Sequence, residues 1–139
     1  MVVNVHLFTY GSLMFPEVWS TVVKGEYERM AARLYSYKRL CVKGEAYPAA
    51  VAATVADYID GQLYLNVGDD DLLRLDRFEG NDYEKVEAPL ILAEGGVVMA
   101  QLYICRYPER LEEREWDVEW FAREGIKDFM AQYGGFSRA

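Results

Sequence analysis

Four residues at the end of a predicted strand could hold an anion. Tyr10, Gly11, Ser12 and Leu13 directly follow the apolar run Val2–Phe8. Because glycine and serine are small, the backbone N–H groups of this loop stay accessible, and consecutive accessible N–H groups bind carboxylate or phosphate. A Gly-Ser pair after a strand is also a common turn, so the loop by itself leaves both interpretations open.

Glu79 is the carboxylate best placed to act as a general base. It lies seven residues after Leu72 and four after Leu75, so a helix over this stretch places Glu79 on the apolar face. Gly80 ends the helix, which puts Glu79 at the negative end of the helix dipole. Burial and the dipole both raise the pKa of a carboxyl group, as a base working near neutral pH requires. If the helix unwinds before Glu79, the side chain is instead solvated.

The other acidic residues are predicted to have structural or solvated roles. Asp76 and Arg77 fall on the opposite helix face from the apolar stripe, in solvent. Three consecutive aspartates, 69–71, point in different directions and fit a helix cap and first turn better than a metal site. The charged run 109–114 is predicted to be a solvated connection before the last helix.

The rare residue types exclude several kinds of chemistry. His6 is the only histidine and lies within a predicted strand, so a histidine-based triad is not expected. Cys41 and Cys105 lie in apolar, strand-like stretches, where cysteine is usually a small buried hydrophobic residue. No metal site is therefore predicted, and acid–base chemistry falls to a carboxylate.

Length and charge indicate one domain, and they leave small molecules as allowed ligands. The 139 residues are read as a single domain spanning 1–139, long enough to bury its own core. With 15 Lys and Arg against 23 Asp and Glu, the net charge of −8 disfavours nucleic acid or an anionic membrane as a partner. The N-terminus has no signal-peptide pattern and no stretch is long enough to span a bilayer, so a cytoplasmic location is expected.

Hydrophobic patterning predicts an α+β fold with many strands. Helices are expected to begin near Phe15, to run from Asp69 to a stop at Gly80, and to run from about Glu113 to Tyr133, where Gly125 weakens or bends the middle. The predicted strands are Val2–Thr9, Arg29–Val42, Ala49–Val55, Gln62–Val67, Tyr83–Ala93 and Val97–Tyr107. Because strands and helices do not alternate regularly, we expect an antiparallel or mixed sheet closed into a small barrel with helices outside.

The order of these motifs resembles the gamma-glutamylcyclotransferase-like family, in the branch named after a plant avirulence-induced gene. Two segments carry most of the resemblance, Phe8-Thr9-Tyr10-Gly11-Ser12-Leu13 and Leu75-Asp76-Arg77-Phe78-Glu79-Gly80-Asn81-Asp82-Tyr83. The further matching segments are Lys43–Pro48, Gly61–Tyr64 and Glu115–Phe121. Together they span most of the chain in the family's order.

The resemblance implies a small mixed-strand barrel flanked by helices, with a cavity at one end. It also implies an enzyme that needs no cofactor and releases 5-oxoproline from a gamma-glutamyl amine or gamma-glutamyl-amino acid. In that family the substrate's own α-amine attacks its γ-carbonyl, and Glu79 corresponds to the catalytic base. The α-carboxylate would be bound by backbone N–H groups of Tyr10, Gly11, Ser12, Leu13, Met14 and Phe15.

Two tyrosines, Tyr47 and Tyr83, are candidates to line the cavity and hydrogen-bond the substrate, although each could equally be a core tyrosine. The alternative to an enzyme is a barrel that binds a small carboxylate without turnover. The leaving amine and the oligomeric state stay open at this point.

Overall fold

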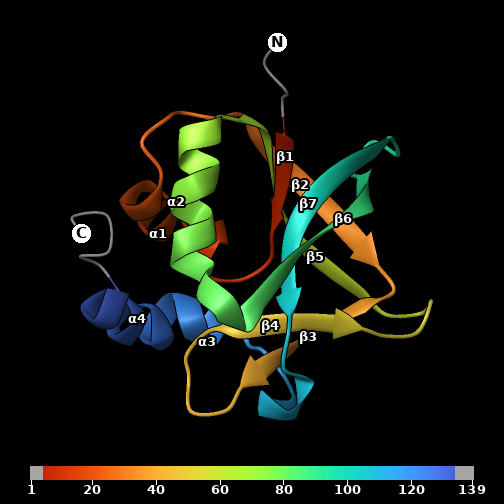
Figure 1. The fold of residues 1–139 in the computed structure, drawn as a ribbon. Coiled ribbons are helices and arrows are strands. Elements are labelled where there is room, and N and C mark those ends of the chain that lie inside the picture. The colour runs from red at the N-terminus through yellow and green to blue at the C-terminus, as the bar shows by residue number, and fades with distance from the viewer. Residues whose placement is uncertain (1–4, 134–139) are drawn as a thin grey trace.

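A barrel and a smaller sheet account for the strands in the part of the chain that the structure describes. A computed structural model describes residues 5–133, and Figure 1 shows a barrel flanked by helices with the smaller sheet at one end. The strands are β1 (Val5–Thr9), β2 (Arg29–Tyr35), β3 (Tyr37–Val42), β4 (Pro48–Ala52), β5 (Tyr58–Val67), β6 (Tyr83–Leu92), β7 (Val97–Cys105) and β8 (Leu111–Glu115). Val2–Asn4 of the first predicted strand lie outside the described residues.

The barrel closes through one parallel pair of strands. Its order is β1-β5-β2-β6-β7, and β1 and β7 meet in parallel at Leu7 and Gln101 while the other pairs are antiparallel. Closure removes free sheet edges, which would otherwise pair with other chains. The prediction of a small mixed-strand barrel flanked by helices is confirmed.

The predicted strand Arg29–Val42 is wrong as a single element. Ser36 has a positive φ of 71° and divides it into β2, which pairs with β5 and β6, and β3, which pairs with β4 and β8. The break is held by two backbone bonds, Ser36 N–H to Asp57 O at 2.8 Å and Ala53 N–H to Ser36 O at 2.8 Å. The chain thus leaves the barrel at Ser36 and enters the three-stranded sheet, order β4-β3-β8.

The last helix begins later than predicted. Leu111–Glu115 is strand β8, paired with β3, so the predicted helix start at Glu113 is wrong. Asp117 caps the helix instead, with its Oδ1 accepting from the Trp120 N–H at 3.0 Å. The helical stretch then comprises α3 (Val118–Trp120), a π-helical turn (Phe121–Gly125) and α4 (Ile126–Tyr133). Gly125 therefore lies where the helix is locally widened, in line with the predicted weak point.

Two further helices and three 3₁₀ turns complete the described chain. They are α1 (Pro16–Val22), α2 (Asp69–Glu79) and the turns η1 (Ser12–Met14), η2 (Gly80–Asp82) and η3 (Pro108–Arg110). Pro16 occupies the first turn of α1, where its missing N–H costs nothing. No helix within residues 5–133 has the length and apolar character needed to cross a membrane.

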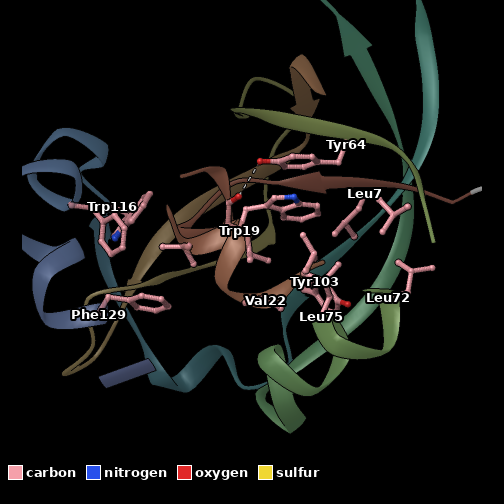
Figure 2. Packing of buried hydrophobic residues seen from close by; sticks show 14 of the residues in the cluster. Leu7, Trp19, Val22, Tyr64, Leu72, Leu75, Tyr103, Trp116 and Phe129 are labelled. Carbon is pink, nitrogen blue, oxygen red and sulfur yellow. Dashed lines mark hydrogen bonds between the residues drawn. The ribbon is translucent and has the colours of Figure 1, made fainter. Parts of the chain in front are cut away.

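Aromatic side chains fill the core between the helices and the barrel. Trp19 of α1 stacks on Tyr64 of β5 with ring centroids 3.7 Å apart, and Figure 2 shows this pair beside Leu7. At the other end of the same cluster, the rings of Trp116 and Phe129 both contact that of Phe121, with centroids 5.1 and 5.7 Å from it. Cys41 is buried, as expected for a cysteine in an apolar stretch, whereas Cys105 is half-buried; both are free thiols.

Asp71 has a role that the sequence pattern missed. The expected aspartate cap is wrong, because Gly68 is the N-cap residue of α2 and no side chain caps it. Asp71 is 4% exposed and accepts hydrogen bonds from the backbone N–H groups of Lys24 and Gly25, both at 2.9 Å. It also accepts from the Tyr27 hydroxyl at 2.6 Å and from Arg74 Nη1 at 2.6 Å. These bonds fasten the loop between α1 and β2 to α2.

The variant Asp71→Asn is expected to lower the free energy of unfolding at pH 7 by about 2–3 kcal/mol. Burial acts to raise the pKa of Asp71, but the hydrogen bonds it accepts outweigh burial and hold the pKa below its ordinary value. Its contribution is therefore present at neutral pH and is lost as the pH falls through that lowered pKa. Urea unfolding at the two pH values should show that the free energy of unfolding of Asp71→Asn differs less from that of wild type at pH 3 than at pH 7.

A matched control for this prediction is Asp70→Asn, which removes an exposed carboxylate from the same helical turn. It should leave the unfolding midpoint nearly unchanged. Equal effects of the two substitutions would contradict the assigned role of Asp71.

Candidate active site

A cavity of about 210 Å³ lies at the end of β1, where the barrel meets α2 and α4. Its volume suits a ligand smaller than a typical drug-like molecule. The lining residues are Phe8, Thr9, Tyr10, Gly11, Ser12, Leu13, Tyr47, Pro48, Phe78, Glu79, Asp82, Tyr83, Tyr103 and Phe129. The structure therefore brings the Tyr10–Leu13 loop and Glu79 to one cavity, although they are far apart in sequence.

The loop offers backbone donors to this cavity. Within residues 5–133, the N–H groups of Gly11, Ser12 and Leu13 donate to no acceptor. Three adjacent unpaired N–H groups in a cavity wall favour an anionic ligand, because a buried donor without an acceptor costs free energy. A Cβ at Gly11 would lie 3.0 Å from Cδ and Cγ of Pro48, so a larger residue would displace the cavity wall.

Met14 and Phe15 were expected in the binding loop, but the structure does not bring them to the cavity. The N–H of Met14 donates to Gly11 O at 3.0 Å, and that of Phe15 donates to Ser12 O at 3.1 Å. These bonds close the turn η1 and use up both donors. The ring of Phe15 instead packs against Phe121, with centroids 5.1 Å apart.

Tyr10 holds the loop in place through its side chain. Its hydroxyl donates to Tyr103 O and accepts from the Ala50 N–H at 3.2 Å, and the ring is only 6% exposed. Arg39 Nη1 donates to Tyr10 O at 2.8 Å. Burial, followed by the charge of Glu79, raises the pKa of Tyr10, so the hydroxyl stays neutral. Tyr10 thus ties the start of the loop to β3, β4 and β7.

Glu79 is the last residue of α2 and contributes its carboxyl group to the cavity wall. Gly80, with φ of 71°, ends the helix there. Burial, and secondly the charge of Asp76, raises the pKa of Glu79 to about 8. The predicted rise is thus present, and the charge of Asp76 is a cause of it that the sequence did not indicate.

Asp76 is partly exposed to solvent, but it also makes contacts that helix periodicity did not predict. Its Oδ1 accepts from the Tyr103 hydroxyl at 2.5 Å and from Lys85 Nζ at 3.0 Å. Periodicity within the helix cannot reveal these contacts, because Lys85 and Tyr103 reach Asp76 from β6 and β7. Arg77, on the outer face, is exposed as expected.

Both candidate tyrosines line the cavity. The Tyr83 hydroxyl donates to Pro48 O at 2.8 Å, which leaves its oxygen able to accept a further hydrogen bond. Tyr47 lies with its ring nearly perpendicular to that of Phe129, with centroids 6.3 Å apart. Each therefore contacts both the aromatic core and the cavity.

Several lining residues were not singled out from the sequence. Phe78 and Asp82 lie close to Glu79 in the motif Leu75–Tyr83, so their closeness in sequence to the predicted base could have indicated that they line the cavity. Phe129 belongs to the apolar stripe of the last helix, and Tyr103 reaches the cavity only because the barrel closes. Neither pattern by itself indicates a ligand site.

The charges around the cavity are suited to a zwitterion. Among the residues that line it, all of them within the described range, the formally charged types are Glu79 and Asp82, and no Lys, Arg or His is present. Unpaired N–H groups favour a carboxylate at one side, while carboxylate side chains favour an ammonium at the other. No group of three His, Cys, Asp or Glu that could hold a metal ion occurs in residues 5–133.

A closed five-stranded barrel brings a half-buried carboxylate and a loop of unpaired backbone N–H groups to one cavity, an arrangement that fits a small cyclotransferase-type domain. Residues 7–120 match the family model described as "Gamma-glutamyl cyclotransferase, AIG2-like". The chain belongs to this family, which confirms the resemblance found in the sequence.

Individual relatives agree with this assignment. The chain is 30% identical to AIG2-like protein A of Arabidopsis thaliana over 132 residues, covering 92% of this chain and 78% of the relative. A solution structure of another Arabidopsis thaliana protein superposes with a TM-score of 0.70 at 25% identity, covering 96% of this chain and 91% of that one. A mouse AIG2-like protein shares the fold, with a TM-score of 0.62 at 19% identity over 82% and 88% of the two chains.

Proposed function

We propose that the protein is a gamma-glutamylcyclotransferase that releases 5-oxoproline from a gamma-glutamyl amine or gamma-glutamyl-amino acid. The proposal rests on one observation above all: Glu79, with a pKa raised to about 8, lines the same cavity as the unpaired N–H groups of Gly11, Ser12 and Leu13. Membership of the cyclotransferase family supports the same reaction class.

In this proposal the loop orients the glutamyl group. Its α-carboxylate accepts hydrogen bonds from the N–H groups of Gly11, Ser12 and Leu13, and its α-ammonium faces Glu79. The Tyr83 hydroxyl, which donates to Pro48 O, accepts a bond from a substrate N–H. Fixing both ends of the α-amino acid leaves the γ-carbonyl within reach of its own amine.

The reaction exchanges one C–N bond for another. Glu79 takes a proton from the α-ammonium, and the resulting amine attacks the γ-carbonyl carbon to form a five-membered ring. The bond from that carbon to the amide nitrogen breaks as Glu79 returns the proton to the departing nitrogen. A second proton follows from the ring nitrogen, so the α-nitrogen ends with one hydrogen and the leaving amine departs as an ammonium. No proton is gained or lost overall.

This chemistry asks little of the protein beyond positioning and proton transfer. Ring closure within one molecule benefits from the high effective concentration of a well-oriented nucleophile. A general acid–base group contributes a further factor of about 10² to 10⁴. In this proposal the loop supplies the positioning and Glu79 supplies the proton transfer.

Purified protein incubated with a panel of gamma-glutamyl amines and gamma-glutamyl-amino acids should release 5-oxoproline from at least one of them, detected by mass spectrometry. The matching α-glutamyl isomers are the control, because their α-amine cannot form the same ring with the same leaving group. Ligands that raise the melting temperature yet remain intact would favour a barrel that binds small carboxylates without turnover.

A further inference from the structure

We propose that Asp76 is a positioning residue for Glu79: its negative charge, held one helical turn from the base by Tyr103 and Lys85, makes Glu79 strong enough to take a proton from an ammonium. The inference rests on the proposed function and extends it to a group outside the cavity lining. Figure 1 shows α2, which carries both carboxylates, running beside the barrel strands.

The geometry places Asp76 next to the base. Residues three apart on a helix are neighbours on its surface, with Cβ atoms about 5–6 Å apart. Asp76 and Glu79 have this spacing in the last turns of α2. Asp76 is also tied to the cavity wall, because the Tyr103 hydroxyl that donates to it at 2.5 Å belongs to a lining residue.

Lys85 forms an ion pair with Asp76 in addition to the hydrogen bond from Tyr103. Its Nζ lies 3.0 Å from Oδ1 and 3.3 Å from Oδ2 of Asp76. The side chains are 30% and 41% exposed, so the pair is reached by solvent and the ammonium offsets the carboxylate only in part. Removing Lys85 should therefore strengthen the effect of Asp76 on Glu79, whereas neutralising Asp76 should abolish it.

Of the other titratable groups that face the cavity, three stay neutral and a fourth is ion-paired. Burial raises the pKa of three of the lining tyrosines, so these stay neutral. Asp82 is ion-paired with Arg110 at 2.9 Å. The titratable lining residues besides Glu79 are Tyr10 after β1, Tyr47 before β4, Asp82 in η2, Tyr83 in β6 and Tyr103 in β7.

The proposed reaction requires a base whose pKa is close to that of the α-ammonium. An α-ammonium has an ordinary pKa of about 8, whereas the pKa of an ordinary glutamate is about 4. Proton transfer from the ammonium to such a glutamate is therefore unfavourable by several pKa units. Burial favours the neutral form of Glu79, and the adjacent negative charge of Asp76 acts in the same direction. The two together match the base to the ammonium.

The test follows the protonation of Glu79 itself. The side-chain carboxyl signal of Glu79 is assigned in ¹³C NMR spectra by its loss in Glu79→Gln, and is then titrated in wild type, Asp76→Asn and Lys85→Met. We expect the midpoint to fall by about one pH unit in Asp76→Asn and to rise in Lys85→Met. Asp76→Asn keeps the oxygen that accepts from Tyr103, so the fold is retained. Asp70→Asn, on the exposed first turn of α2, should leave the midpoint unchanged.

The acidic limb of the pH profile of kcat/KM should likewise move to lower pH in Asp76→Asn and to higher pH in Lys85→Met. A merely structural role for Asp76 would not shift the two variants oppositely. Midpoints that move together, or by no more than in Asp70→Asn, would overturn the inference. If the midpoints of the two variants shift in opposite directions but the wild-type protein releases no 5-oxoproline from any substrate, the proposed function is overturned instead. The catalytic role assigned to Asp76 is then overturned with it.

Discussion

Glu79→Gln is expected to lower the release of 5-oxoproline by a factor of about 10² to 10⁴, with the barrel intact. Glutamine has nearly the same shape as glutamate but cannot accept the proton of the α-ammonium. Binding of the α-carboxylate should persist, because the N–H groups of Gly11, Ser12 and Leu13 are unaffected. The measurement is kcat with the best substrate of the panel, together with Kd for the same compound under conditions of negligible turnover.

The same variant should be more stable than wild type at alkaline pH. The pKa of Glu79 is raised by folding from an ordinary value of 4.5 to about 8, so the stabilisation of the protonated form is complete at acid pH and is lost as the pH rises through about 8. Glutamine carries no such charge. We therefore expect similar melting temperatures at pH 4.5, and a melting temperature higher by roughly 5 °C for Glu79→Gln at pH 9.

Glu87→Gln provides the control for both effects, since Glu87 is exposed on β6 and does not line the cavity. It should leave kcat and the melting temperature near wild type at each pH. Turnover by Glu79→Gln within tenfold of wild type would remove Glu79 from the mechanism. A variant that loses turnover because it unfolds would be recognised by the melting curve.

The loop and the base could each be predicted because both features are local in sequence. Gly11 and Ser12 follow an apolar strand, and Glu79 precedes the glycine that ends an amphipathic helix. Each property depends on neighbours within one or two helical turns. Their meeting in one cavity is a property of the barrel, which the family resemblance implied and the local pattern could not.

The incorrect predictions have a common physical origin in contacts between distant segments. Ser36 breaks a continuous apolar alternation without any glycine or proline, since its positive φ is stabilised by bonds to Asp57 and Ala53. The charged run 109–114 was predicted to be a solvated connection, yet Leu111–Glu115 pairs with β3 as the outer strand of the small sheet. Asp76 is brought to Tyr103 and Lys85 by strands that lie far along the chain.

Gly61→Ala is expected to destabilise the barrel by about 3 kcal/mol or more. A Cβ at this position would lie 2.2 Å from the carbonyl oxygen of Thr9 and 2.7 Å from Cζ of Phe8. Thr9 belongs to β1, the strand paired with β5, so its carbonyl cannot rotate away as a side chain could. The two strands must separate to admit a methyl group, and urea unfolding should report the loss directly.

The effect should reach the active site as well, because Thr9 lines the cavity and immediately precedes the Tyr10–Leu13 loop. Any Gly61→Ala protein that remains folded should bind gamma-glutamyl compounds more weakly than wild type, since moving Thr9 displaces the three N–H donors. Gly96→Ala is the matched control: its added Cβ would meet Leu92 Cδ1 at an ordinary 3.7 Å in the β6–β7 turn. A Gly61→Ala variant as stable as Gly96→Ala would show that the barrel can absorb the methyl group, and that the close approach of β1 and β5 does not fix the loop.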